Sequence, residues 1–335
     1  MIHIIFHNDF DGQFAAYAAW KYFQNQNTLD SVKFIPVSYG DKFPLDMEEL
    51  HPEDHVYVFS FLYERELMDE LKEKVRHLLF FNHMESAEEK FAGASYAIIN
   101  TAISSGARVW DHFFPIKRLP LVGQYIGDRK MWKKRHPETP QMHSWLNFAQ
   151  LGQDWEKWDD LATDMESVQI ALKNGRLLLR YEERMVESFI NLPNNVLVQH
   201  GHLVKDHSDQ STKYAIFNGG TFFTSEIAQA VMKKFDVDYT IDWRVDMGND
   251  IVTFNIRSRD GEKFSAKEYA PKNGGAGLAE SAGFPIHVVD GLHLDHGTRP
   301  RLDPGDGGHP PGLRIEDLAH AELRAENALH SLISM

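Results

Sequence analysis

The feature that most constrains the fold is a regular alternation of short apolar runs and helical segments in the first part of the chain. Residues 2–6 form an apolar run with β-branched side chains, and residues 12–26, rich in alanine, follow with helical periodicity. Further runs of strand length stand at 32–38, 56–61, 78–81 and 96–99, and further helical patterns at 64–76 and 104–114. This alternation predicts an α/β fold, a doubly wound and mainly parallel sheet with helices on both faces.

The sequence pattern differs in two further regions of the chain. Residues from about 119 to 191 read as helices, and 155–191 fits either one long helix or two. A second α+β unit follows, with a strand at 214–218, a helix at 225–235 and a hairpin of 239–245 and 251–258. We expect four parts: an α/β domain at 1–150, a helical connector at 151–195, a smaller α+β domain at 196–285, and a Gly/Pro-rich tail with a terminal helix at 286–335.

Composition excludes several kinds of chemistry. The chain has 335 residues, no cysteine, 18 histidines and a formal net charge of −14. The absence of cysteine excludes disulfide scaffolds, cysteine-ligated metal sites and cysteine nucleophiles, and the acidic balance excludes a uniformly basic surface for nucleic acid. Any metal must therefore be bound by histidine and carboxylate side chains. Because no run approaches the roughly 18 apolar residues of a membrane span, and residues 1–10 lack a signal-peptide pattern, we expect a cytoplasmic protein without a membrane partner.

Polar side chains stand where predicted strands end, which is where open α/β sheets carry their sites. His7, Asp9 and Asp11 alternate directly after the first strand, and residues 82–84 follow the fourth. Residues two apart project the same way in an extended chain, and imidazole with carboxylate suits Mn²⁺, Mg²⁺ or Zn²⁺. The pattern is equally compatible with a loop whose side chains cap the first helix.

Taken together, these segments resemble the motifs of the DHH phosphoesterases. FHNDFDGQFAAYAAW is similar to the first motif, H-x-D-x-D-G before a small-residue helix, and VYVFSFLYERE to the second, whose strand ends in a metal-bridging Asp. FFNHMESAEE resembles the D-H-H triplet, and SSGARVWDHFFP with YIGDRKMW resembles the segment that carries the fourth motif's Asp. NIRSRDG and GGAGLAESAGF are similar to the family's substrate domain. The resemblance covers about residues 1–285 in the family's order.

The resemblance implies a metal-dependent phosphoesterase site in a cleft between two domains. Carried over, His7 and Asp9 would bind one Mn²⁺ or Mg²⁺ ion, and Asp11, His83 and Asp128 would bind the other. Metal-bound water would attack a phosphodiester or phosphoanhydride bond in a short single-stranded nucleic acid, a cyclic dinucleotide or polyphosphate. For Asp128, a carboxylate at the N-terminus of a helix stays open as an alternative.

The resemblance also implies a phosphate-binding surface in the second domain. Arg257 and Ser258 stand at a strand end beside a Gly-rich loop, which we expect to open a short helix within 273–284. Gly274, Gly275 and Gly277 would leave backbone N–H groups available to an anion there. An exposed hairpin arginine is the alternative for Arg257.

Four positions depart from the family pattern. Ser60 stands at the bridging Asp, Asn82 at the triplet Asp, Met84 at the triplet's second His and Leu278 at the glycine-loop His. Two dications about 3.5–4 Å apart repel each other and need anionic ligands, of which the bridging one is missing here. We therefore expect one bound ion or none, with hydrolysis weak or lost.

Two hypotheses from different classes follow. The first is a metal-dependent phosphodiesterase, exonuclease or exopolyphosphatase-like enzyme. The second is a pseudoenzyme that binds a nucleotide, an RNA end or a protein partner in the interdomain cleft, and the site chemistry favours it. A homodimer is left open.

Overall fold

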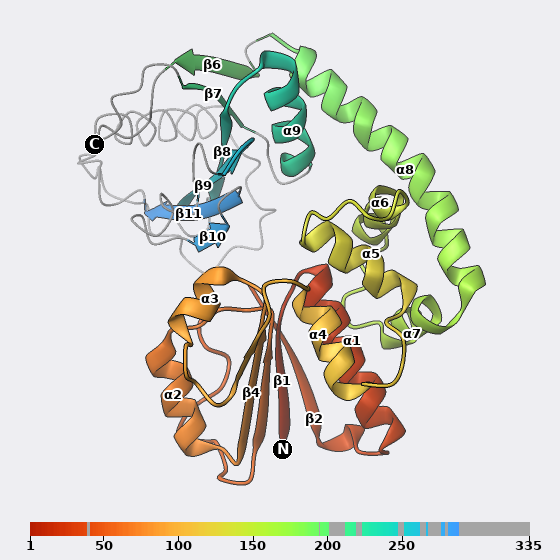
Figure 1. The fold of residues 1–335 in the computed structure, drawn as a ribbon, viewed down its shortest axis with the longest axis vertical. Helices are drawn as coiled ribbons and strands as arrows, with labels where there is room; N and C mark the ends of the chain where they lie inside the picture. Colours follow the sequence, from red (N-terminus) through yellow and green to blue (C-terminus); the bar gives the residue numbers. More distant parts are fainter. Residues whose placement is uncertain are drawn as a thin grey trace, which may run out of the picture. The chain divides into compact units, whose positions relative to one another are not determined.

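The computed structural model describes residues 1–38, 41–193, 195–200, 212–218, 223–246, 251–261, 266, 276–278 and 281–287 (Figure 1). The chain divides into two units, Met1–Glu182 and Glu183–Met335. The finer division into four parts stays a prediction. Within the described ranges, no helix combines the length and the apolar character needed to cross a bilayer.

The first unit is built on a parallel five-stranded sheet, which confirms the predicted α/β class. Its strands are β1 (Ile2–His7), β2 (Val32–Val37), β3 (His55–Phe59), β4 (His77–Asn82) and β5 (Ala97–Ile99), in the order β2-β1-β3-β4-β5. The order runs outward from β1 in both directions, so the topology switches between β1 and β3. Ligand sites of open α/β sheets form at such a switch point, beyond the carboxyl ends of the strands.

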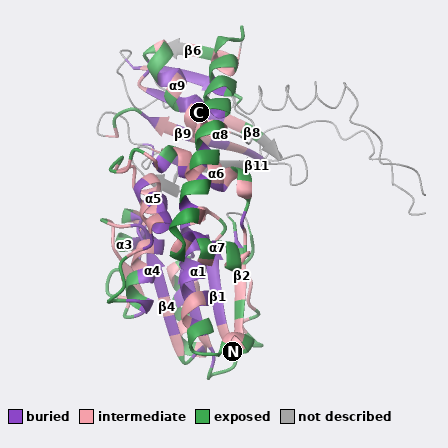
Figure 2. Cartoon of the chain, turned by 90° about the vertical axis from the view of Figure 1, so that its right-hand side faces the viewer, coloured by how far each residue is buried: buried purple, intermediate pink, exposed green. Residues whose placement is uncertain are grey.

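Helices cover both faces of this sheet (Figure 1). One face carries α1 (Phe10–Asn25) and α4 (Ser105–Phe113), and the other carries α2 (Arg65–Lys74) and α3 (Glu85–Lys90); a short 3₁₀ turn, Leu29–Ser31, precedes β2. Successive side chains of β1 point to opposite faces of the sheet. Phe6 belongs to the hydrophobic core on the α1 side, and Ile5 belongs to the core on the α2 side. In Figure 2, β1 and β4 are mostly buried, whereas β2 is mostly of intermediate exposure.

The predicted helical character of 119–191 is confirmed, and the helices there are α5 (Leu121–Lys130), α6 (Thr139–Ala149), α7 (Trp155–Thr163) and α8 (Met165–Asn191). Residues 155–191 therefore form two helices, α7 and α8, rather than one. Asp164 separates them and accepts hydrogen bonds from the Ser167 backbone N–H and hydroxyl, so it starts α8. Tyr17 of α1 stacks on the buried Trp158 of α7 at 6.4 Å between ring centroids, which joins α7 to the first core.

The second unit contains a mixed sheet, the helix α9 (Thr224–Phe235) and the last residues of α8. The strands are β6 (Val196–His200), β7 (Lys213–Phe217), β8 (Tyr239–Asp246), β9 (Ile251–Ser258), β10 (Ala276–Leu278) and β11 (Ser281–His287), in the order β10-β11-β9-β8-β7-β6. The predicted hairpin is confirmed, since β8 and β9 pair antiparallel.

The expected helix within 273–284 is wrong. The described part of this segment consists of β10 and β11, which pair antiparallel, and β11 also pairs with β9. A Cβ on Gly283 would lie 2.9 Å from the Asn255 side-chain oxygen, so the small residues fit a closely paired strand. Pairing with β9 therefore stabilises a strand where the local sequence predicts a helix. Strand β11 extends to His287, so it includes the first two residues of the segment predicted as a Gly/Pro-rich tail, 286–335. Gly274, Gly275 and the rest of that tail, with its predicted terminal helix, lie outside the described residues.

Candidate functional site

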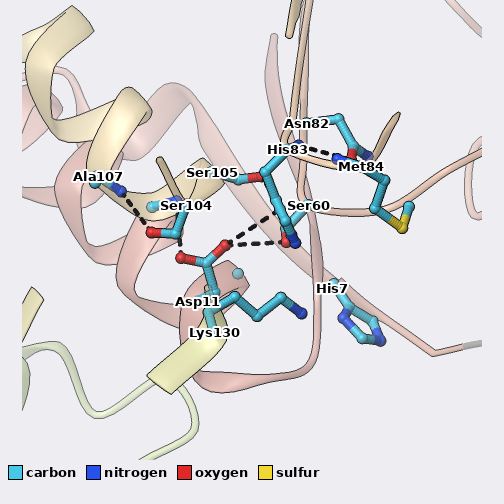
Figure 3. Close-up of polar contacts among 12 residues, drawn as sticks. His7, Asp11, Ser60, Asn82, His83, Met84, Ser104, Ser105, Ala107 and Lys130 are labelled. Carbon is cyan, nitrogen blue, oxygen red and sulfur yellow. Dashed lines mark hydrogen bonds and ion pairs between the residues drawn. The ribbon is translucent and has the colours of Figure 1, made fainter. Parts of the chain in front are cut away.

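The polar residues singled out in the sequence gather at the carboxyl ends of β1, β3 and β4 (Figure 3). His7 is the last residue of β1, Ser60 follows β3, and Asn82 is the last residue of β4. Because these strands are parallel neighbours, their ends meet at one edge of the sheet, at the switch point. The predicted strand ends at 6, 61 and 81 lie within two residues of the observed ends, at His7, Phe59 and Asn82.

Asp9 is the N-cap of α1 and also one half of an ion pair. Its Oδ1 accepts a hydrogen bond from the Gly12 backbone N–H at 2.8 Å, and its Oδ2 lies 2.6 Å from the Lys130 ammonium and 3.0 Å from His7 Nδ1. Burial alone would raise the pKa of Asp9, but Lys130 and then His7 hold it well below its usual range. The Asp9 carboxylate is thus both a helix cap and a negative charge already matched by a lysine.

Helix α1 begins at Phe10, two residues earlier than predicted, so Asp11 lies inside its first turn. The expected extended alternation of His7, Asp9 and Asp11 is therefore wrong at its third member. The turn from strand to helix is tight, because a Cβ on Gly12 would collide with the carbonyl oxygen of His7. This close approach is the physical reason for a glycine at position 12.

Asp11 is a buried carboxylate held by neutral donors. The Gly106 backbone N–H donates to its Oδ1 at 3.0 Å, and the Ser60 hydroxyl donates to its Oδ2 at 3.2 Å. Only 1% of Asp11 is exposed, and His83 Nδ1 lies 3.9 Å from Oδ2 (Figure 3). Gly106 belongs to the first turn of α4, whose N-terminus favours a negative charge.

Ser60 has a left-handed backbone, with φ of 58°. This conformation is uncommon for a residue with a Cβ, and here the backbone hydrogen bond from Ser60 N to the Phe81 carbonyl oxygen and the side-chain bond to Asp11 maintain it. The residue at the family's bridging position is therefore aimed at Asp11 but carries a hydroxyl instead of a carboxylate.

His83 and Asn82 are both buried. His83 Nδ1 lies 2.8 Å from the Ser105 hydroxyl, and burial lowers the pKa of His83 by more than the neighbouring Asp11 raises it. The Asn82 side-chain oxygen accepts from the backbone N–H groups of His83 and Met84, at 2.8 and 3.0 Å. Its amide nitrogen has no hydrogen-bond partner within the described residues.

The Asp128 carboxylate forms hydrogen bonds with the loop that follows its own helix. It lies in the last turns of α5, so the alternative of a carboxylate at a helix N-terminus is wrong. Its carboxylate accepts hydrogen bonds from the backbone N–H of Arg135 (2.7 Å) and His136 (3.3 Å) and from the Thr139 hydroxyl (2.6 Å). Burial would raise the pKa of Asp128, but these bonds hold it below its usual range. The contacts assign Asp128 a role in closing the α5–α6 loop.

A cavity of about 120 Å³ adjoins the two aspartates of the first motif. Its wall is mostly apolar, with charged groups from Asp9, Asp11, Arg129 and Lys130; the other lining residues are Phe10, Tyr125, Ile126, Met142, His143 and Leu146. Lys130, Ser105 and Gly106 are site residues that the sequence reasoning missed. Ser104 before a predicted helix is a recognisable N-cap, which locates Ser105 and Gly106, whereas no local signal marks Lys130.

The residues do not fit a pair of divalent ions. Within the described part of the chain, no group of three or more histidine and carboxylate side chains is arranged to bind a metal. Asp9 is occupied by Lys130, both oxygens of Asp11 accept from neutral donors, and Asp128 is bonded to its own loop. A bridging position without a carboxylate leaves the repulsion between two dications uncompensated.

The candidate phosphate-binding residues of the second unit have partners of their own. Arg257 donates to Asp242 Oδ1 at 2.5 Å and to the Ser225 hydroxyl at 3.1 Å, which corrects the alternative of an exposed hairpin arginine. The Ser258 hydroxyl donates to the Asp260 carbonyl oxygen at 2.8 Å. Gly277 pairs with Ala282 inside β10, so it does not stand at a helix start.

No family model matches this sequence. An uncharacterized protein of Acanthamoeba polyphaga mimivirus is 20% identical over 290 residues, which are 84% of this chain, and the chain spans 66% of that relative's length.

Several solved structures are similar in fold. The pGpG-specific phosphodiesterase PggH from Vibrio cholerae is 14% identical, with 99% of each chain covered and a TM-score of 0.44. RecJ from Thermus thermophilus in complex with Mn²⁺ is 12% identical, covering 85% of this chain and 49% of that one, with a TM-score of 0.46. CDC45 from Entamoeba histolytica is 9% identical, covering 100% of this chain and 95% of that one, with a TM-score of 0.45. At these identities the likeness concerns the fold alone. The first three of the segments that resemble DHH motifs lie at the ends of β1, β3 and β4 of the parallel sheet, in the order that the resemblance implies.

Proposed function

We propose that this chain is a DHH-like protein that binds a phosphate-containing ligand without hydrolysing it. The observation that carries the proposal is Ser60, whose hydroxyl donates to Asp11 at the position where the sequence resemblance expects a metal-bridging carboxylate. A hydroxyl brings no negative charge, so it does not offset the repulsion of two dications or stabilise a metal-bound hydroxide. Asn82 and Met84 remove a further carboxylate and a further imidazole from the same edge.

The candidate site residues keep a binding role in this proposal. His7, Asp9, Asp11 and His83 form a polar edge beside the 120 Å³ cavity, and Arg129 and Lys130 bring positive charge to its wall. Positive side chains with an apolar wall suit a ligand that carries both phosphate and an apolar or aromatic part, such as a nucleotide or the end of a short RNA. Arg257, Ser258 and Gly277 of the second unit stay candidates for phosphate binding, as do Gly274 and Gly275 outside the described residues.

The test compares turnover with binding in the purified full chain. We expect no hydrolysis of bis-p-nitrophenyl phosphate or of a dinucleotide with Mn²⁺ or Mg²⁺ above the level of Asp11→Ala, measured by absorbance and chromatography. In the same samples, a dinucleotide or a 5′-phosphorylated short RNA should raise the melting temperature and be recovered intact. Metal-dependent turnover that Asp11→Ala abolishes would establish the competing hypothesis, an active phosphoesterase. If no ligand shifts the melting temperature, the binding proposal fails.

A further inference from the structure

We propose that Lys130 is a built-in cation that occupies the place of a divalent ion in this site, so that the site is stable without metal and excludes it. The inference rests on the proposed loss of hydrolysis but concerns a separate property, the charge balance of the site. It follows from the misfit between the residues present and a metal pair.

The first step is the position of the ammonium group. Lys130 is the last residue of α5, yet its Nζ lies 2.6 Å from the Asp9 carboxylate, 121 residues earlier in the chain. The same carboxylate oxygen lies 3.0 Å from His7 Nδ1. His7 and Asp9 are the two side chains that the sequence resemblance assigns to one metal ion, and the lysine contacts that pair.

The second step is mutual exclusion. A dication bound to Asp9 Oδ2 would lie about 2 Å from that oxygen, in the space that the ammonium group faces at 2.6 Å. Two positive charges at such a separation repel strongly at the partly buried edge of a protein. Asp9 can therefore hold Lys130 or a divalent ion, but not both. The end of α5 also favours the lysine, because a helix C-terminus stabilises a positive charge.

The third step is the rest of the site. Both oxygens of Asp11 already accept hydrogen bonds, from Gly106 N and the Ser60 hydroxyl. The buried Asn82 amide nitrogen, which has no partner within the described residues, offers a donor where the resemblance expects a carboxylate acceptor. The backbone and hydroxyl donors already bond to the Asp11 oxygens, and Asn82 brings no negative charge, so the position next to Lys130 offers little attraction to a divalent ion.

The inference predicts that removal of one amine creates metal affinity. Lys130→Ala leaves His7 and Asp9 without their cation, and one Mn²⁺ ion should then bind. The matched control is Lys134→Ala, because Lys134 is exposed, lies four residues away and carries the same charge. Lys130→Met keeps much of the side-chain volume and serves if the alanine variant fails to fold.

The experiment measures Mn²⁺ binding by calorimetry and the melting temperature with Mn²⁺ or with EDTA. Wild type and Lys134→Ala should show no binding and no shift in either reagent. Lys130→Ala and Lys130→Met should bind one equivalent of Mn²⁺ and melt about 5 °C higher in saturating Mn²⁺. Adding Asp9→Ala to Lys130→Met should abolish the gain, which locates the ion.

Two results would overturn the inference. One is Mn²⁺ binding by wild type as tight as by the Lys130 variants, and the other is no Mn²⁺ binding by the Lys130 variants. The failures remain distinguishable. Hydrolysis by wild type contradicts the proposed function, whereas metal-free Lys130 variants contradict only the role of Lys130.

Discussion

Each unit of this chain contains a short ion pair that includes a candidate ligand-binding residue, Asp9 in the first unit and Arg257 in the second. The two pairs differ in how far they are buried. In the first unit, Lys130 and Asp9 lie 2.6 Å apart with 30% and 28% of their side chains exposed. In the second, Arg257 and Asp242 lie 2.5 Å apart with 15% and 2% exposed. The first pair stands at the edge of a cavity where a ligand can reach it, and the second is enclosed between strands and α9.

The effect of burial on the two aspartates differs between the pairs. Burial raises the pKa of Asp242 even though Arg257 opposes the shift, so the arginine is needed to compensate a buried carboxylate. The pKa of Asp9 is instead lowered, because Lys130 and His7 outweigh its burial. An arginine committed to a buried partner is a poorer candidate for phosphate binding than its position in the sequence indicates.

The largest effect should come from breaking the enclosed pair. We expect Arg257→Ala to lower the free energy of unfolding of the second unit by about 3–5 kcal/mol, because it leaves Asp242 buried without a cation. Urea denaturation followed by fluorescence measures the loss. The control is Arg259→Ala, which breaks the exposed pair with Asp236 and should cost less than about 1 kcal/mol. Equal losses in the two variants would contradict a structural role for Arg257.

The next effect concerns the buried carboxylate of the first unit. Asp11→Ala should cost about 2–4 kcal/mol, because the Gly106 N–H and the Ser60 hydroxyl lose their acceptor inside the protein. The measurement is again urea denaturation. Asp111→Ala, which removes a carboxylate from an exposed pair with Arg108, should change stability by less than about 1 kcal/mol. If Asp11→Ala loses no more stability than Asp111→Ala, the two hydrogen bonds that Asp11 accepts do not contribute as expected.

A smaller effect is expected at the cavity edge. Lys130→Ala should lower stability by about 1 kcal/mol without metal, since partly exposed pairs contribute little after screening. The loss should shrink in molar salt, whereas that of Arg257→Ala should persist. A salt-independent loss of the same size as that of Arg257→Ala would erase the distinction between the two pairs.

The smallest effect is the acid dependence of the Lys130 contribution. The folded-state pKa of Asp9 is lowered from an ordinary value of 3.8, so its stabilisation is present above that value and disappears as the pH falls below it. The difference in unfolding free energy between wild type and Lys130→Ala should therefore be constant from pH 7 to about 5 and decline in stronger acid. Denaturation curves at several pH values provide the check, and a difference that grows in acid would contradict it.

Much of the first unit could be predicted from the sequence because its signals are local. Apolar runs of strand length, such as the one at 2–6, and the alanine-rich helical pattern that follows place the strands and helices within a few residues. The second unit was harder to predict where its strands are short. The segment 273–284 is predicted from its sequence as a Gly-rich loop that opens a short helix, whereas residues from Ser281 onward form a strand that pairs with β9.

The candidate site divides in the same way. The strand-end positions of His7, Asp9 and His83 follow from the alternation of elements, and their proximity follows from parallel strands sharing an edge. The position of Asp128 in the sequence did not reveal that its carboxylate bonds to Thr139, eleven residues on. The sequence gives the chemical type of each residue, but it does not reveal which other residue that side chain contacts.

The sequence alone was enough to predict the α/β class of the first unit and the edge of the sheet where polar residues collect, and it shows no carboxylate at Ser60 and Asn82, where the resemblance expects one. Only the tertiary structure decided that Lys130 reaches Asp9 and that Gly106 and Ser60 satisfy Asp11. Periodicity and composition act over a few neighbouring residues, whereas ion pairs join groups that are far apart in the chain, such as Lys130 and Asp9, which are 121 residues apart. Such pairs form only after helices and strands have packed.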